Sequence, residues 1–160
     1  MPKWFVVNVA DAAAVGNEVC GYWAAFEDPE APFADFGINI HVIQPGQPNA
    51  KYHSESVQED FLVLSGECLA IIDGEERPLR AWDLVHCPAG TEHVFVGAGD
   101  GPCAILMVGA RRPGGTVHYP VNELAAKHGA SAAEPTASGA EAYADWSDDF
   151  TETRLEWPPA

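Results

Sequence analysis

Short runs of hydrophobic residues alternate with glycine- and proline-rich turns along the chain, and this pattern predicts mainly β-structure. The alternation is clearest in residues 36–44, where polar Asn39 and His41 separate apolar neighbours. Residues 61–64 are apolar throughout, which is typical of a strand buried on both faces. Both segments therefore predict strands of one hydrophobic core.

A hairpin signal follows at Asp73-Gly74, because a type I′ turn needs two residues that tolerate positive φ. Further short strands are expected at residues 83–87, 93–96 and 103–109. Almost no segment shows helical periodicity. Many short strands with close spacing predict an all-β sandwich or small barrel.

Before this region, residues 4–9 predict an additional strand that lies at a sheet edge or crosses to a partner, and residues 10–15 predict a helical turn. Residues 21–36 are expected to form a loop, because their prolines remove hydrogen-bond donors.

After the predicted barrel, residues 121–128 are expected to form a short helix, with Asn122 as its cap and Gly129 at its end. Residues 130–160 are rich in Ala, Ser, Pro and acidic residues, which predicts a loosely ordered acidic tail. The tail nevertheless contains large apolar side chains. We expect these to pack in a surface groove, either of the same barrel or of a neighbour: Tyr143, Trp146, Phe150, Leu155 and Trp157.

Composition limits the classes of function. The chain has 160 residues, 47% of them hydrophobic, which is enough for one domain with a substantial core. Its net charge of -16 makes binding to nucleic acids or anionic membranes improbable, because those partners require a basic surface. The apolar run at the N-terminus is too short for a secretory signal or membrane span, so a cytoplasmic location is expected.

Four cysteines are widely spaced and form no Cys-x-x-Cys pair: Cys20, Cys68, Cys87 and Cys103. Zinc ligation is the alternative to buried reduced thiols, and the apolar surroundings favour the thiols.

Candidate chemistry is concentrated in two segments. On an extended chain His53 and Glu55 project to the same side, and Glu59 follows at the head of the apolar run. About thirty residues later, a Pro/Gly turn leads to His93 at the start of another strand. Imidazole and carboxylate groups are common ligands for divalent first-row metals. The four side chains therefore predict a metal site.

Each of these residues also has a simpler interpretation. The two histidines are either ligands or core histidines with satisfied hydrogen bonds, and Glu59 is either a ligand or a surface acid. A carboxylate at the start of an apolar run is costly to bury without a cation, which favours ligation. Glu55 is a ligand, a general base or a hydrogen-bond partner for a bound molecule. Gln58 is expected to face the other way by strand alternation.

The two segments resemble the motifs of the cupin family. His53, Glu59 and Gly66 keep the register of the first motif, whereas Glu55 stands where its second histidine is expected. In the second motif the match comprises three residues, Pro88, Gly90 and His93, while Trp82 replaces a glycine and Gly97 an asparagine.

The resemblance covers roughly residues 36–110 and implies a double-stranded β-helix, or jelly-roll barrel. It suggests an N-terminal extension over residues 1–35, a cupin barrel over 36–112, and a short helix and acidic tail over 113–160. Single-barrel cupins frequently pair through outer strands, so the resemblance also implies a homodimer.

The ligand types suit iron, manganese, nickel or zinc, whereas calcium and magnesium prefer oxygen ligands. The resemblance leaves two classes of function. One is a metal-dependent enzyme acting on a small organic substrate, either a dioxygenase or an isomerase with Glu55 as base. The other is a non-catalytic module that binds a small ligand or metal. Four further candidates for pocket-lining positions are expected to be structural: His41, Tyr52, Trp82 and His86.

Overall fold

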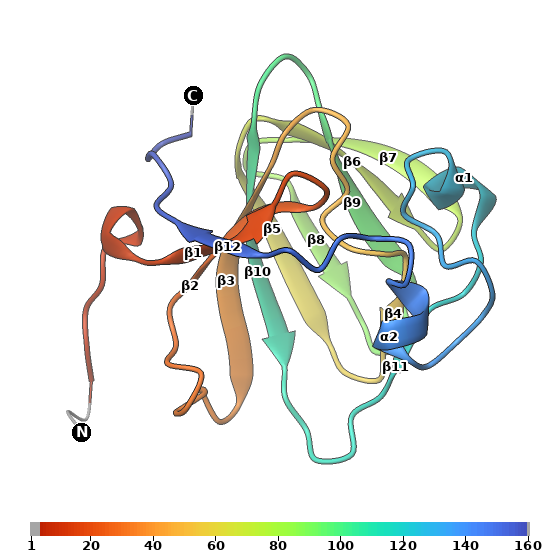
Figure 1. Ribbon diagram of the computed structural model, residues 1–160, viewed down its shortest axis with the longest axis horizontal. Coiled ribbons are helices and arrows are strands. Elements are labelled where there is room, and N and C mark those ends of the chain that lie inside the picture. The colour runs from red at the N-terminus through yellow and green to blue at the C-terminus, as the bar shows by residue number, and fades with distance from the viewer. Residues whose placement is uncertain (1–3, 160) are drawn as a thin grey trace.

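The computed structural model describes residues 4–159, which form mostly antiparallel β-structure (Figure 1). The strands, in chain order, are β1 (Ala14–Asn17), β2 (Gly21–Ala25), β3 (Phe36–Ile43), β4 (Ser54–Glu55), β5 (Glu59–Ser65), β6 (Glu67–Ile72), β7 (Glu75–Arg80), β8 (Leu84–Cys87), β9 (His93–Ala98), β10 (Cys103–Ala110), β11 (Val117–His118) and β12 (Thr151–Thr153). The helical segments are η1 (Val9–Asp11), α1 (Glu123–Ala126) and α2 (Gly139–Ala142).

Two larger sheets enclose the main core. The seven-stranded sheet has the order β12-β1-β2-β3-β10-β5-β8, and the three-stranded sheet has the order β7-β6-β9. Apolar side chains of both sheets meet between them: Ile43, Phe61, Val63, Cys68, Ala70, Cys87, Phe95, Cys103 and Ile105. This arrangement confirms the predicted all-β jelly-roll with a short C-terminal helix and an extended tail.

Local sequence signals explain several elements. Asp73 and Gly74 have φ values of 45° and 77°, as a type I′ turn requires, and they join β6 to β7. Asn122 caps α1 by accepting a hydrogen bond from the backbone N–H of Ala125 at 2.9 Å. Gly129 follows with a φ of 69°. The predicted hairpin and helix cap are therefore confirmed.

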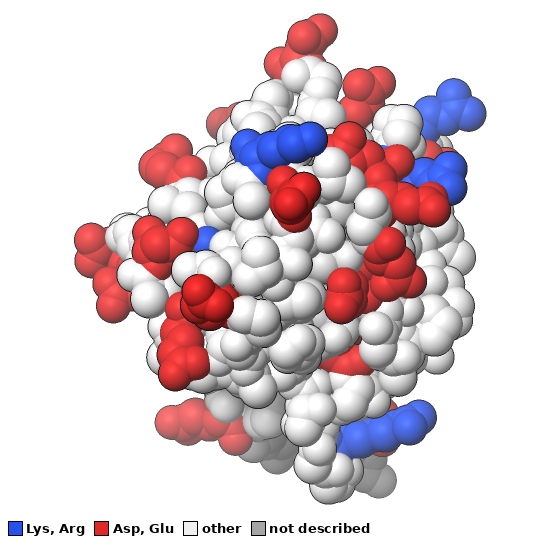
Figure 2. Space-filling view, turned by 90° about the vertical axis from the view of Figure 1, so that its right-hand side faces the viewer, with Lys and Arg blue, Asp and Glu red and all other residues white. Residues whose placement is uncertain are grey.

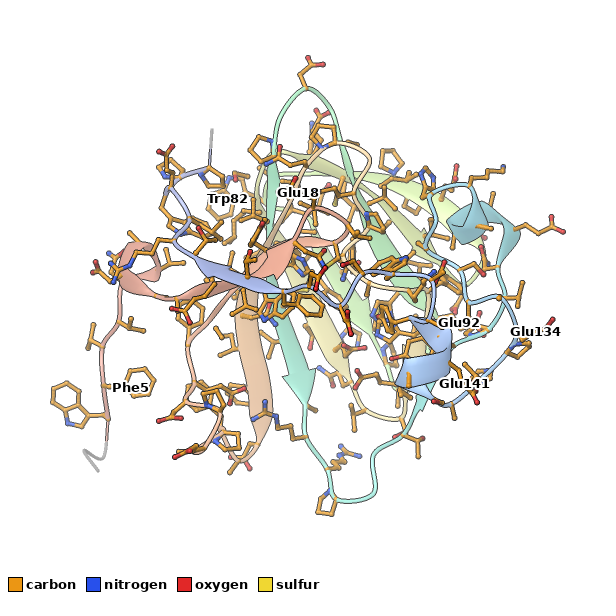
Figure 3. All side chains as sticks on the ribbon, in the orientation of Figure 1. Phe5, Glu18, Trp82, Glu92, Glu134 and Glu141 are labelled. Carbon is orange, nitrogen blue, oxygen red and sulfur yellow. The ribbon has the colours of Figure 1, made fainter. Side chains whose placement is uncertain are left out.

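The N-terminal predictions were partly wrong. Residues 4–8 form an exposed arm without strand pairing, and Figure 3 shows Phe5 on this arm, away from the sheets. The helical turn lies at η1, whereas residues 14–17 form strand β1. β2 occupies residues expected to be a loop, because pairing with β1 on one side and β3 on the other satisfies its backbone. The homodimer remains a prediction, and the exposed apolar arm is one surface available for it.

The C-terminal tail is ordered, contrary to the prediction, and it wraps around the edge of its own seven-stranded sheet. Trp146 and Phe150 line a cavity with Trp23 of β2, and β12 then pairs with β1. Beyond β12, Leu155 and Trp157 pack against a cluster of β3 and β10 residues on the opposite face. The prediction that apolar tail residues fill a groove is therefore confirmed, and the groove belongs to the same chain.

All four cysteines are buried and free, as predicted. Within residues 4–159, no helix has the length and hydrophobicity needed to cross a membrane.

Candidate metal centre

The backbone places His53 and His93 side by side. The two residues form an antiparallel bridge, in which each N–H donates to the other carbonyl at 3.1 and 2.8 Å. Their ring centroids are 4.8 Å apart. The Pro/Gly turn before β9 and the short strand β4 after His53 therefore deliver two imidazoles to one point.

Each histidine ring makes a hydrogen bond through Nδ1, and this bond determines which ring nitrogen carries the proton. Nδ1 of His53 lies 2.7 Å from the carbonyl of Lys51, and Nδ1 of His93 lies 3.1 Å from the carbonyl of Thr91. A carbonyl only accepts, so both Nδ1 atoms carry the proton and both Nε2 atoms present a lone pair. Burial lowers the pKa of His53, and burial together with the neighbouring His53 lowers the pKa of His93 to about 4. Both rings are therefore neutral at pH 7 and suited to metal ligation.

Glu59 supplies the third ligand atom from the first position of β5. Its Oε2 lies 3.3 Å from Nε2 of His93, and the ligand atoms of His53, Glu59 and His93 all lie within 4.8 Å of one another. Burial, with a smaller contribution from Glu55, raises the pKa of Glu59 to about 8. A bound cation would offset this penalty, so the donor set fits a divalent metal.

Glu55 lines the same cavity from β4 but lies outside this group of three. Its charge contributes to the raised pKa of Glu59. Its role as a fourth ligand or a base stays a prediction. Gln58 is exposed and donates a hydrogen bond to Asp60, so it faces away from the centre as expected.

The centre opens into a cavity of about 330 Å³. Apolar side chains such as Phe61 and Met107 form part of its wall, and Asn39, Asn49 and Arg111 contribute polar groups. No motif in the sequence identified these three polar residues as parts of the site. For Asn39 the sequence did contain a signal. Every second residue of β3 points to the same side, so Asn39 shares a face with Ile43, which is part of the core.

Residues 39–109 match the family described as a cupin domain. The barrel of this chain is therefore a cupin domain. The match includes all three metal-centre residues of this cupin, whereas the N-terminal strands and the C-terminal tail lie outside it. A comparison with curated proteins gives no match.

Solved structures support the same fold. A sugar phosphate isomerase of the cupin superfamily from Silicibacter pomeroyi aligns with a TM-score of 0.55 and 22% identity, covering 95% of this chain and 82% of its own. The polyketide cyclase RemF from Streptomyces resistomycificus aligns with a TM-score of 0.58 and 18% identity, covering 70% and 83%. A candidate sugar phosphate isomerase from Acidithiobacillus ferrooxidans has 26% identity and a TM-score of 0.50. That alignment covers 52% of this chain and 55% of the isomerase, so the cupin spans about half of its length.

Two departures from the cupin motifs have visible structural consequences. Trp82 replaces the motif glycine and has a φ of 76°, a conformation that favours glycine. Gly97 replaces the motif asparagine, and a Cβ there would lie 2.1 Å from the carbonyl oxygen of Gln44. A side chain at position 97 would therefore require the backbone to move.

The remaining candidates from the sequence have structural roles or are exposed. His41 is buried and its Nε2 donates to the carbonyl of Cys20 at 2.7 Å. Tyr52 is buried, and its hydroxyl accepts from the backbone N–H of Gly74. His86 pairs with Asp60 at 2.6 Å, and Trp82 is 75% exposed.

Proposed function

We propose that this cupin binds one divalent transition metal through His53, Glu59 and His93 and acts as an enzyme on a small, uncharged organic substrate. The observation that supports it is a buried carboxylate beside two neutral imidazoles, open to a cavity large enough for a small molecule. When bound, the metal would act as a Lewis acid for a carbonyl oxygen or as a centre for oxygen chemistry.

The charges around the cavity favour a substrate without a phosphate group. Among the described residues lining the cavity, Arg111 is the only Lys or Arg. Its guanidinium donates to Glu27 at 2.8 Å and to the carbonyl of Phe33 at 2.7 Å, so its charge is already paired. Glu55 and Glu59 add negative charge to the wall. The proposed substrate therefore differs from the sugar phosphates for which two structural neighbours are named.

The cavity contains two polar groups suited to act on such a substrate. Within residues 4–159 no hydrogen bond or ion pair engages the carboxylate of Glu55, so it is free to accept a proton from a carbon next to a carbonyl. Asn39 lines the cavity and its buried Oδ1 has no protein partner, so a substrate hydroxyl that displaces the wall enough to reach it would satisfy this acceptor. Phe61 and Met107 would exclude water from the apolar part of the substrate.

The first test is elemental analysis of protein purified without added metal or chelator. Wild type is expected to contain about one equivalent of a transition metal, and His93→Ala should lose it. His118→Ala is the matched control, because this imidazole is exposed and lies outside the centre. Wild-type protein that takes up no metal even after reconstitution would overturn the proposal.

The second test separates an enzyme from a binding module. Metal-loaded protein is incubated in deuterium oxide with a panel of enolisable ketones, and exchange at the α-carbon is followed by NMR, alongside oxygen uptake. Exchange that Glu55→Gln abolishes without loss of metal supports an isomerase-type reaction with Glu55 as base. Oxygen consumption by an iron-containing protein supports a dioxygenase. Stoichiometric metal with neither activity favours the alternative, a non-catalytic small-ligand module.

A further inference from the structure

A second cavity of about 330 Å³ lies next to the metal-centre cavity, and Asn49 lines both. Trp23 of β2 contributes one part of its wall. Tyr143, Trp146 and Phe150, from the segment after α2, contribute another. Apart from Asn49, the residues that line this cavity lie in two stretches of chain outside the cupin match.

The four aromatic rings form two perpendicular pairs. Trp23 and Phe150 are 5.6 Å apart at 68°, and Tyr143 and Trp146 are 5.2 Å apart at 74°. The rings of each pair are nearly perpendicular, so the aromatic surface around the cavity has more than one orientation. The face of an aromatic ring carries partial negative charge, so such a wall attracts cations.

The charges around this cavity also favour a cation. Among the described residues that line it, none is Lys or Arg, and Asp148 contributes an exposed carboxylate. The whole chain has a net charge of -16, and acidic side chains far outnumber basic ones on the face shown in Figure 2. A cation would gain from this field, whereas an anion would be repelled.

Trp146 already contacts one ammonium group of the protein itself. Nζ of Lys51 lies 5.0 Å from the centroid of the Trp146 ring and is paired with Asp145 at 2.8 Å. The same indole also lines the second cavity. One face of the Trp146 ring is therefore already occupied by Lys51, and Asp145 balances the charge of that ammonium.

We propose that the second cavity binds a small organic cation with a quaternary ammonium group. A primary ammonium would lose hydrogen bonds to water that this largely aromatic wall cannot replace. A quaternary ammonium has no N–H donors to satisfy, and its methyl groups would contact the aromatic wall directly. The site is separate from the proposed catalytic function and does not depend on a metal.

Choline is the probe, and 3,3-dimethylbutan-1-ol is its matched control, because the alcohol has the same shape without the charge. Both are titrated into the 160-residue protein by calorimetry, with tryptophan fluorescence as a second readout. We expect one saturable site that binds choline roughly tenfold more tightly than the alcohol. Equal affinities would show an apolar site without cation selectivity, and no saturable binding of choline would remove the site altogether.

Variants locate the binding. Trp23→Leu keeps the wall apolar but removes an aromatic ring, and Asp148→Asn removes the nearby negative charge. Each variant should lower the affinity for choline about fivefold. Trp82→Leu should have no effect, because Trp82 is exposed and outside the cavity. Asp148 is exposed, so its variant tests the proposal even if Trp23→Leu does not fold.

Chelator treatment separates this proposal from the metal site. The affinity for choline should be unchanged in metal-free protein and in His93→Ala. Loss of choline binding in both, with normal binding in Asp148→Asn, would place choline at the metal centre and overturn the proposal.

Discussion

The two cavities have similar volumes and share Asn49, but they differ in origin and charge. Both lie on the same face of the seven-stranded sheet. Asn39 and His41 are two residues apart on β3, so their side chains point to the same face, and Trp23 is paired with His41 from β2. The metal-centre cavity is lined only by residues 37–111. The second cavity, called the aromatic cavity from here on, is lined mainly by Trp23 of β2 and by residues 143–150.

Their difference in charge is equally clear. In the metal-centre cavity Glu59 is largely buried, and its pKa is raised to about 8. In the aromatic cavity the carboxylate of Asp148 is exposed, and the buried surface is mostly aromatic. The first site therefore gains most from a compact metal ion that contacts the carboxylate directly. The second suits a larger, weakly hydrated cation.

The largest expected effect on metal binding separates the two glutamates of the candidate metal centre. Glu59→Gln keeps the side-chain shape but removes a ligand charge, so metal affinity should fall on the order of a hundredfold. Glu55→Gln should change affinity less than about tenfold, because Glu55 lies outside the group of mutually close donors. Competition with a metal-sensitive dye measures both. The opposite order would show that Glu55 is the main carboxylate ligand.

A second prediction concerns the sheet that both cavities share. Burial lowers the pKa of His41 to about 4, below its ordinary value of 6.5, so the neutral form is favoured in the folded state. Its contribution to stability is therefore complete above pH 6.5 and is lost as pH falls towards 4. The loss amounts to about 3 kcal/mol.

Chemical denaturation of metal-free wild type and His41→Gln between pH 7 and 4 measures this effect. The buried histidines of the metal centre titrate in the same direction, so the difference between the two proteins isolates His41. Parallel pH profiles would contradict the assignment.

A third prediction tests whether the aromatic cavity can be disrupted alone. Lys51 is fully buried, and Asp145→Asn would remove the negative charge that balances its ammonium, leaving neutral acceptors such as the carbonyls of Gly129 and Ser131. Because Asp145 is itself exposed, we expect a loss of about 2 kcal/mol rather than the full effect of a buried pair, and a Tm lower by about 4 to 8 °C.

Choline binding should weaken in Asp145→Asn, since Lys51 packs on Trp146, while metal content stays normal. Asp149→Asn is the control, because Asp149 is an exposed acid of the same segment. If both variants lose the same stability, the effect is one of net charge and does not come from the ion pair.

The contrast between the cavities also shows how far the sequence can predict this molecule. The hairpin at Asp73-Gly74 and the strands around it depend on local signals, and the structure has them as expected. The three candidate ligands that the structure brings together, His53, Glu59 and His93, were predicted because each lies beside a turn or an apolar run. The burial that makes Glu59 a strong candidate is likewise visible in the apolar residues after it.

The second cavity could not be predicted in this way, because its parts are far apart in the sequence. Trp23 and Phe150 become neighbours only after β12 pairs with β1 at the edge of the sheet. The segment containing Trp23 looked like a loop, since no local signal predicts its pairing with β3. The tail looked disordered from its composition, yet its few aromatic residues are the ones that contact the sheet. Long-range pairing therefore determined the elements that were wrongly predicted.

The smallest expected effect is on stability, and it distinguishes a polar side chain that supports the fold from one that could bind substrate in the metal-centre cavity. Oδ1 of Asn49 accepts from the buried backbone N–H of Phe95 at 2.8 Å, so Asn49→Ala should cost about 1 to 2 kcal/mol of unfolding free energy. Oδ1 of Asn39 is buried without a protein partner, so Asn39→Ala should change stability by less than about 0.5 kcal/mol. Urea denaturation of both variants measures the difference. A loss as large as that of Asn49→Ala would assign Asn39 to the fold and remove it from substrate binding, whereas an unchanged stability leaves its amide free for a ligand.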